Sequence, residues 1–391
     1  MPIYLDNAAT ANPKAPGVAE AMARSLTDCN ANPGHGGHRL AVRATVAVYE
    51  ARAALAALLG VADPARLIFT SGATAALNQA IWASLPGSGQ VLCSVWEHNA
   101  VLRPLAAWRR RTGGSVVALP PGDGRPLTVE AVEQAITPDT KLIVLTAASN
   151  VTGAFNPVAE VGEVARRHGI RLLVDGSQVA GHLPSQLDAA PVDLWVAAGH
   201  KGLLGPQGIG LLYVRPGIEL EPLIRGGTGF HSEQEDHPEE LPEHLEAGTL
   251  NTPGILGLGA AADFLLGRGL AHLRTQEEER TAALLDGLAR LPGGVETFTA
   301  RTPRHGVGVV SLRLPNWSPA DAAAVLDREF DIATRAGLHC APLAHRALGT
   351  TPEGTLRLSV GPFTSKDDIA ATVDALDRMV RRAAAGRRTH A

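Results

Sequence analysis

Lysine is rare in this chain, and one lysine stands where a reactive amine would be useful. The sequence holds four lysines, Lys14, Lys141, Lys201 and Lys366, against thirty-one arginines. Lys201 follows the apolar run LWVAAG and precedes a glycine-rich turn, where backbone can approach a ligand closely. A partly desolvated lysine there can form a Schiff base with a carbonyl group. We expect the other three lysines to be solvated.

Polar residues follow other apolar runs in the same way. Asp175 closes the run RLLVD, and Gln178 comes three residues later. A carboxylate after buried aliphatic residues needs a cationic or hydrogen-bonded partner, although Asp175 could equally cap a following helix. FTSGATAALNQAIWA predicts strand, turn and helix, so that residues 71–74 would offer a backbone anion site, although plain glycine turns are common. His98 follows QVLCSV, where a histidine is more often structural than catalytic.

Together, these residues favour one cofactor. A lysine, an aspartate, an aromatic ring and a phosphate cradle describe a site for pyridoxal 5′-phosphate. The scaffold that would align them is also visible in the sequence. Seven short apolar runs recur between residues 66 and 214, and most of the gaps between them hold helical patterns. This alternation predicts a largely parallel sheet covered by helices on both faces, with functional residues at the carboxyl ends of its strands.

The length of 391 residues exceeds what one hydrophobic core usually supports, so we expect two domains. The acidic segment 230–244 predicts a loop, and from about residue 270 the pattern changes to a long amphipathic helix, two strands and a closing helix. We therefore predict a large cofactor-binding domain over residues 15–265. Residues 1–14 and 266–391 would form a smaller α+β domain.

Composition excludes several other classes of protein. A net charge of −4 argues against a nucleic-acid-binding protein, and no stretch has the roughly 18 uninterrupted apolar residues of a membrane helix. The N-terminus lacks the features of a signal peptide, which favours a cytoplasmic location. Cys29, Cys93 and Cys340 are odd in number and far apart, so they predict neither a disulfide framework nor a metal site.

Eight motifs along nearly the whole chain carry a family resemblance. They are YLDNAAT, FTSGATAALN, EHNAVLRP, SNVTGAFNP, DGSQVAGH, GHKGLLGPQGIG, EAGTLN and RAGLHCAP. In this order they resemble class V aminotransferases of the fold type I pyridoxal-phosphate superfamily, and among these the cysteine desulfurases and selenocysteine lyases. The resemblance implies the fold type I α/β architecture, with a mainly parallel seven-stranded sheet in the large domain and a smaller α+β C-terminal domain.

The resemblance also implies how the ring of the cofactor would be held. Lys201 would bind pyridoxal phosphate covalently, and Asp175 would pair with the pyridinium nitrogen. Gln178 would bond the phenolic oxygen of the ring. His98 would stack on its face and shuttle a proton.

Further roles concern the phosphate and the substrate. Ala73, Thr74 and His200 would hold the phosphate, and Thr249 resembles the residue given to the phosphate of the partner subunit in a homodimer. Substrate-binding residues would be Asn150 and Arg357, which would hold the carboxylate, and Arg335. The family commonly has a hydroxyl residue three positions before the lysine, whereas this chain has Ala198.

Cys340 distinguishes a desulfurase from other members of the superfamily. It stands among Gly337, His339 and Pro342, which is poor core composition, whereas Cys93 lies inside an apolar run and fits a buried role. Positive charge from Arg335, His339 and His345 would favour its thiolate, the reactive form of cysteine.

The reaction implied by the resemblance converts L-cysteine to L-alanine and leaves a persulfide on Cys340. A protein sulfur acceptor would then take the sulfur, as in iron–sulfur cluster assembly. Selenocysteine lyase, or another lyase or transaminase of this fold, is the alternative. Outside this family, GLGAAADF at 257–264 resembles a nucleotide-binding glycine motif but follows no convincing strand. An inactive binding protein would be expected to have lost Lys201, Asp175 or His98.

Overall fold

The computed structural model describes residues 2–34, 36–122, 127–231 and 233–388. Its larger part is built on a seven-stranded sheet in the order β2-β8-β7-β6-β5-β3-β4. The strands are β2 (Leu67–Thr70), β3 (Gln90–Ser94), β4 (Ser115–Leu119), β5 (Thr140–Thr146), β6 (Arg171–Asp175), β7 (Leu194–Ala198) and β8 (Gly210–Val214). The five neighbouring strands β7, β6, β5, β3 and β4 are parallel to one another. Strand β8 runs antiparallel to both of its neighbours, β7 and β2. The predicted mainly parallel sheet is confirmed.

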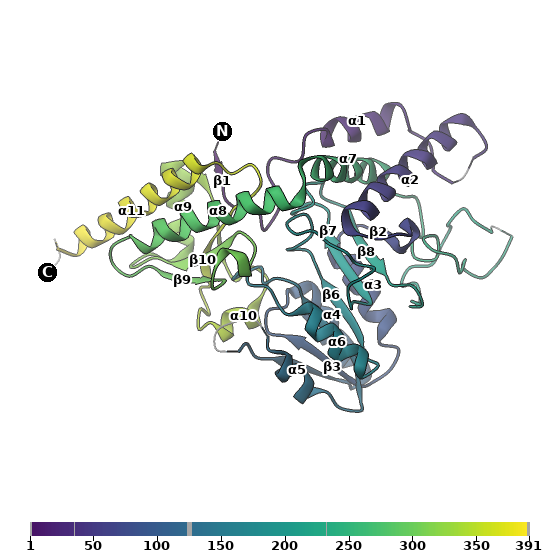
Figure 1. Ribbon diagram of the computed structural model, residues 1–391, viewed down its shortest axis with the longest axis horizontal. Helices are drawn as coiled ribbons and strands as arrows, with labels where there is room; N and C mark the ends of the chain where they lie inside the picture. Colours follow the sequence, from purple (N-terminus) through teal and green to yellow (C-terminus); the bar gives the residue numbers. More distant parts are fainter. Residues whose placement is uncertain (1, 35, 123–126, 232, 389–391) are drawn as a thin grey trace.

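Helices cover both faces of this sheet (Figure 1). One face packs against α3 and α4, and the other against α2, α5, α6 and α7. Neighbouring residues of β6 point into opposite cores, with Leu172 and Val174 in one and Leu173 in the other. Apolar strands without polar alternation are the consequence. These helices are α1 (Val18–Thr27), α2 (Arg39–Leu59), α3 (Ala73–Ser84), α4 (Asn99–Thr112), α5 (Val129–Ala135), α6 (Val158–Arg167) and α7 (Thr252–Arg268).

The smaller part, at the left of Figure 1, has a core of its own around an antiparallel sheet in the order β12-β13-β10-β9. Its first strand, β1 (Ile3–Tyr4), pairs in parallel with β11 (Ile332–Ala333), so the start of the chain lies here. Leu5 belongs to this core, whereas Ala8 packs in the large one. The division at residues 14/15 and 265/266 stays a prediction. The other elements are α8 (Leu270–Ala289), β9 (Glu296–Thr299), β10 (Val309–Arg313), α9 (Pro319–Phe330), β12 (Arg335–Gly337), α10 (Pro342–Ala347), β13 (Thr355–Ser359) and α11 (Lys366–Arg388).

The glycines of GLGAAADF serve helix packing, not nucleotide binding. Both lie inside α7. A Cβ at Gly259 would stand 2.6 Å from the Cβ of Ala51 on α2, and one at Gly257 would stand 2.8 Å from the Cγ of Met22 on α1. The three helices pack together because these positions carry no side chain. No single helix of the described chain is long and apolar enough to span a membrane; α7 and α8 satisfy that criterion only jointly, and they are bent by 81°.

A buried ion pair closes the edge of the sheet at β2. Arg52 on α2 forms two hydrogen bonds to Glu246, at 2.7 and 2.8 Å, and the two side chains are 7% and 4% exposed. The amide of Phe69 donates to the same carboxylate at 2.5 Å, and the guanidinium lies 4.3 Å from the centre of the Phe69 ring. Glu246 therefore covers an edge strand that would otherwise present an unpaired amide.

Replacing Glu246 should destabilise the protein strongly. Glu246→Ala leaves the Arg52 guanidinium buried without its counter-charge, which costs about 3–5 kcal/mol. Chemical denaturation measures the loss as a free energy of unfolding. Glu240→Ala, at a carboxylate that is 69% exposed in the same loop, is the control and should change stability by no more than about 0.5 kcal/mol. Equal losses in the two variants would contradict the assigned role of the pair.

Candidate active site

A cavity of about 860 Å³ opens at the carboxyl ends of the parallel strands. Its wall contains every predicted cofactor- and substrate-binding residue, namely Ala73, Thr74, His98, Asn150, Asp175, Gln178, His200, Lys201, Thr249, Arg335 and Arg357. They come from both parts of the chain and from the loop before α7. Cys340 is not in the wall, although its neighbour His339 is.

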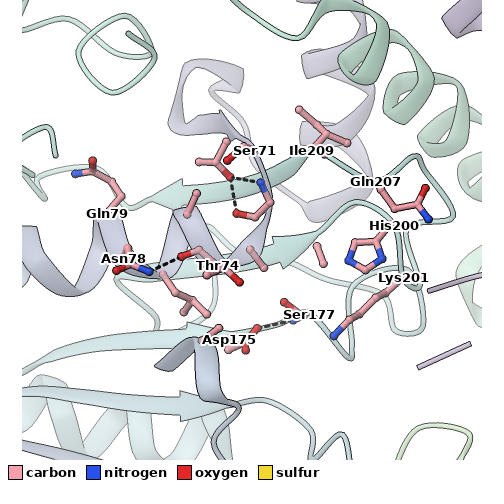
Figure 2. A pocket seen from close by; sticks show the side chains of 18 of the residues that line it. Ser71, Thr74, Asn78, Gln79, Asp175, Ser177, His200, Lys201, Gln207 and Ile209 are labelled. Carbon is pink, nitrogen blue, oxygen red and sulfur yellow. Dashed lines mark hydrogen bonds between the residues drawn. The ribbon is translucent and has the colours of Figure 1, made fainter. Parts of the chain in front are cut away.

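Lys201 lies three residues beyond β7, in a turn tightly packed against the one that follows β6. A Cβ on Gly202 would stand 2.3 Å from the His182 ring, so the position next to the lysine admits no side chain. Figure 2 shows the amine of Lys201 extending toward the turn that carries Asp175. The pKa of Lys201 is lowered to about 8, chiefly by burial; the charge of Asp175 opposes this shift, and that of Arg357 adds to it. A neutral, nucleophilic amine is therefore accessible near neutral pH.

Asp175 is the last residue of β6 and is buried. Its Oδ1 accepts a hydrogen bond from the amide of Ser177 at 3.0 Å, which fixes the carboxylate (Figure 2). No regular helix follows among residues 176–193, so the helix-cap alternative does not hold. Oδ2 has no hydrogen-bond partner among the described residues and is available to a cationic ligand in the cavity.

His98 caps the N-terminus of α4 and also lines the cavity. Its Nδ1 accepts a hydrogen bond from the amide of Ala100 at 3.0 Å. Burial, and then the charge of Lys201, lower the pKa of His98 to about 4, so the ring is neutral near pH 7. Because Nδ1 is an acceptor, Nε2 carries the proton. The structural and functional roles expected for His98 are thus compatible.

The far end of the cavity is suited to an anion. Gly72 begins α3 without a side-chain cap, which leaves the first amides of the helix to a ligand, and Thr74 lies beside them (Figure 2). His200 has a buried Nδ1 without a partner in the described chain. Ala198, the last residue of β7, supplies no hydroxyl here, whereas Ser71 and Thr249 of the same wall do.

Two arginines define the opposite end. Arg335 and Arg357 are direct partners across strands β12 and β13, so their side chains share one face of the sheet. Arg357 is 1% exposed and donates to the carbonyl of Asn150 at 3.1 Å and to Asp6 at 2.8 Å. One nearby carboxylate against two guanidinium groups leaves an excess of positive charge. The Asn150 amide donates to the carbonyl of His339 at 2.6 Å and keeps a second hydrogen for a ligand.

The loop of Cys340 is held firmly at the edge of the cavity. His339 and Cys340 both have positive φ angles, of 48° and 59°. The carbonyl of Cys340 accepts a hydrogen bond from the amide of Asn99 at 2.7 Å, and the next residue, Ala341, packs against Trp96. Cys340 is half-buried and interacts electrostatically with Lys201 and Arg357.

The prediction that His339 and His345 would contribute positive charge near Cys340 was wrong. Burial and the charge of Arg357 lower the pKa of His339 to about 2, and burial with Arg313 lowers that of His345 to about 4. Both rings are therefore neutral near pH 7. The cationic groups that interact with Cys340 are Arg357 and Lys201. Cys93 is buried in β3 as predicted, and burial raises the pKa of its thiol.

Two groups that the sequence did not reveal lie against the site. Lys14 was expected to be solvated, like the exposed Lys141 and Lys366, but it is half-buried and its Nζ donates to the carbonyl of His200 at 3.1 Å. Glu97, next to His98, is fully buried. Its Oε1 accepts from Ser94 and from the amide of Thr146, at 2.5 and 2.9 Å, and its Oε2 has no partner among the described residues. Neither local sequence carries a signal for these contacts.

Comparison with known proteins places this site in a family. The family model for aminotransferase class V matches residues 3–372. The chain therefore belongs to the class V aminotransferase family. Among its relatives, a probable cysteine desulfurase of Halalkalibacterium halodurans is 34% identical, with 96% of this chain and 92% of the relative covered. The cysteine desulfurase CsdA of Escherichia coli K12 is 32% identical, with 96% and 93% covered.

Solved structures agree with this assignment. A cysteine desulfurase from Thermococcus onnurineus superposes with a TM-score of 0.90 at 30% identity, covering 97% of this chain and 95% of that one. The CsdA structure from Escherichia coli superposes with a TM-score of 0.87 at 31% identity, with the same coverage. Both support the predicted fold type I architecture.

Glu97 should make stability fall with rising pH. Burial raises its pKa from an ordinary 4.5 to about 8, so the folded protein keeps a proton that the unfolded chain releases. The free energy of unfolding therefore decreases between about pH 4.5 and about pH 8. Glu97→Gln imitates the protonated form and should lose this decrease, which melting curves across that range would measure. Glu163→Gln, at an exposed carboxylate, is the control. A Glu97→Gln variant with the pH dependence of the parent would contradict the buried-proton assignment.

Proposed function

We propose that this protein is a pyridoxal-phosphate-dependent cysteine desulfurase, which converts L-cysteine to L-alanine and retains the sulfur as a persulfide on Cys340. The observation that carries the proposal is that Lys201 and Asp175 line one cavity and that Cys340, at its edge, interacts electrostatically with Lys201. Lysine and aspartate alone would suit many enzymes of the family. A cysteine held next to them suits sulfur transfer, and the relatives named above are called cysteine desulfurases.

The residues present fit pyridoxal phosphate. The uncapped start of α3 and the Thr74 hydroxyl can take the phosphate, and the free Oδ2 of Asp175 can take the ring nitrogen. Gln178 donates one amide hydrogen to the carbonyl of Ala8 at 3.1 Å, which leaves the second for the phenolic oxygen. When bound, the cofactor supplies an electron sink that stabilises negative charge at the substrate Cα.

The chain's own groups would then perform the remaining tasks. Arg357, Arg335 and Asn150 bind the carboxylate of L-cysteine and so orient its Cα–H bond. The Lys201 amine removes the Cα proton, since its pKa of about 8 suits a base near neutral pH. His98 holds a proton at Nε2 for donation to the substrate.

Sulfur transfer needs the thiolate of Cys340. Its Sγ attacks the substrate sulfur, so that an S–S bond forms and the Cβ–S bond breaks. The electron pair of that bond passes to the carbon skeleton, which takes up a proton at Cβ and is reduced to alanine. The two sulfur atoms are oxidised to the persulfide, and no outside oxidant is required. An external reductant or protein acceptor then removes the terminal sulfur.

The proposal includes a homodimer. Val42, Val46 and Tyr49 are spaced along one face of α2 and are about half exposed. Thr249 is exposed at the cavity wall, where it is accessible to a group of a second subunit. An apolar helix face of this kind favours association with a second copy. A part in iron–sulfur cluster assembly stays a prediction of the family resemblance, and cytoplasmic location stays a prediction from the composition and the N-terminal sequence.

Substitution of the two reactive side chains tests the proposed reaction. Lys201→Ala should lower alanine release from L-cysteine by at least about a hundredfold, because the base is lost. Cys340→Ala should lose the same activity almost entirely while it still binds the cofactor, measured by visible absorbance that borohydride bleaches.

The controls separate cysteine from selenocysteine chemistry. Cys29→Ala should behave like the parent, because Cys29 follows α1 and, unlike Cys340, interacts with neither Lys201 nor Arg357 among the described residues. Cys340→Ala should keep part of any selenocysteine lyase activity, since the C–Se bond is weaker. If Cys340→Ala released alanine from cysteine at the parental rate, with or without reductant, the persulfide role of Cys340 would be refuted. A lyase or transaminase reaction would then be favoured.

The dimer makes a separate prediction. Val46→Glu places a charge on the apolar face of α2 and should convert a dimer to a monomer in sedimentation experiments. Leu266→Glu, at an exposed leucine near the end of α7, is the matched control and should leave the mass unchanged. A parent protein that sediments as a fully active monomer would contradict the proposed homodimer.

A further inference from the structure

The segment that follows β1 binds several residues of the site at once. We call residues 6–15 the N-terminal strap. Asp6 accepts from Arg357, the carbonyl of Ala8 accepts from Gln178, and the amide of Ala11 donates to the carbonyl of His200 at 2.8 Å. The strap thus contacts a predicted substrate-binding residue, a predicted cofactor-binding residue and the neighbour of Lys201. The proposed reaction gives the strap no role.

The strongest tie is to the residue that precedes Lys201. The carbonyl of His200 accepts hydrogen bonds from the amide of Ala11, from Lys14 Nζ at 3.1 Å and from Thr10 Oγ1 at 3.2 Å. This carbonyl and the amide nitrogen of Lys201 belong to one planar peptide unit. Holding the carbonyl therefore fixes the direction in which the backbone of Lys201 leaves the turn.

The donors are arranged in a defined order. Lys14 Nζ also lies 3.0 Å from Thr10 Oγ1. An ammonium group has three donors and no acceptor, so the Thr10 hydroxyl accepts from Lys14 and its own hydrogen is directed to His200. Lys14 thus polarises the threonine hydroxyl and binds the carbonyl itself.

Lys14 is unusual among the lysines of this chain. Lys141 and Lys366 are exposed, whereas Lys14 is half-buried, and desolvation of its ammonium lowers its pKa to about 8. It forms no ion pair in the described chain, and it is not part of the cavity wall. Burial of an unpaired ammonium is unfavourable, so the carbonyl and hydroxyl contacts account for its place.

We infer that Lys14 is a positioning residue, which acts with Thr10 to hold the His200–Lys201 peptide so that the amine of Lys201 meets the aldehyde of the cofactor. The inference rests on the proposed use of pyridoxal phosphate. Lys14 itself touches neither cofactor nor substrate. Its effect should therefore be confined to ligands that bond to Lys201.

A pair of ligands tests this. Pyridoxal phosphate and 4′-deoxypyridoxine 5′-phosphate share the ring and the phosphate, but only the first has an aldehyde that can react with Lys201. Binding of each to the cofactor-free protein can be measured by fluorescence titration. Lys14→Met should weaken the affinity for pyridoxal phosphate about tenfold, the effect of losing one charge-assisted hydrogen bond, and should leave the deoxy compound unaffected. Lys366→Met, at an exposed lysine, should change neither affinity.

Two further variants make the test independent of how well Lys14→Met folds. Thr10→Val keeps the shape of the side chain and should show the same selective loss, but smaller. In a Lys201→Ala background, Lys14→Met should leave the affinity for pyridoxal phosphate unchanged, because the residue it positions is gone.

The outcomes separate this inference from the proposed function. An equal loss of affinity for both ligands would show that Lys14 acts on the phosphate charge or on folding, and would overturn the inference. If the parent binds both ligands and Lys14→Met binds them with unchanged affinities, the inference is also overturned. A parent protein that bound neither ligand would refute the use of pyridoxal phosphate, and the inference with it.

Discussion

Lys201 is partly buried and its amine interacts with the carboxylate of Asp175, and much of the molecule is arranged around that pair. Asp175 ends β6 and Lys201 follows β7, and the parallel pairing of these strands brings their carboxyl ends to the same edge of the sheet. Desolvation disfavours the charged amine and the carboxylate favours it. The balance leaves a pKa of about 8, which is low enough for a nucleophile and high enough for an effective base.

The histidines of the site do not contribute to its positive charge near neutral pH. Burial is the largest cause of the lowered pKa in each of His98, His200, His339 and His345. All four rings are neutral near pH 7, so they can accept or donate hydrogen bonds without competing for anions. Positive charge at the cavity wall is concentrated in Lys201 and the two arginines of β12 and β13. The electrostatics of the cavity near neutral pH therefore depends on groups of high intrinsic pKa.

The sequence was sufficient to predict the sheet and the residues at the ends of its strands. Apolar runs locate β2 to β8, and the residues that follow a parallel strand must meet at one edge, which is why Lys201, Asp175 and His98 were found together. Contacts made across the fold were not predictable. Nothing in the sequence near Lys14 indicates that its amine will donate a hydrogen bond to a carbonyl 186 residues away. Likewise, His339 and His345 are neutral because they are buried, and their burial cannot be predicted from the residues next to them in the sequence. Strand β9 and helix α9 were not predicted either.

The two parts of the molecule must keep their relative position for the site to exist. Lys201 and Asp175 belong to the large sheet, whereas Arg335, Arg357 and Cys340 belong to the smaller part. Glu277 of α8 links the two, because its carboxylate bonds His182 of the large part at 2.5 Å and the amide of Gly308.

Burial raises the pKa of Glu277, but the charges of His182 and Arg274 lower it overall, so the link stays ionised. Displacing one part relative to the other would remove the hydrogen bond from His182 to this buried, ionised carboxylate, which is unfavourable. In the proposed reaction this rigidity keeps Cys340 next to the substrate sulfur. Since Cys340 is half-buried at the edge of the cavity and not in its wall, a persulfide formed on it in the proposed reaction would also lie near the surface, within reach of a sulfur acceptor.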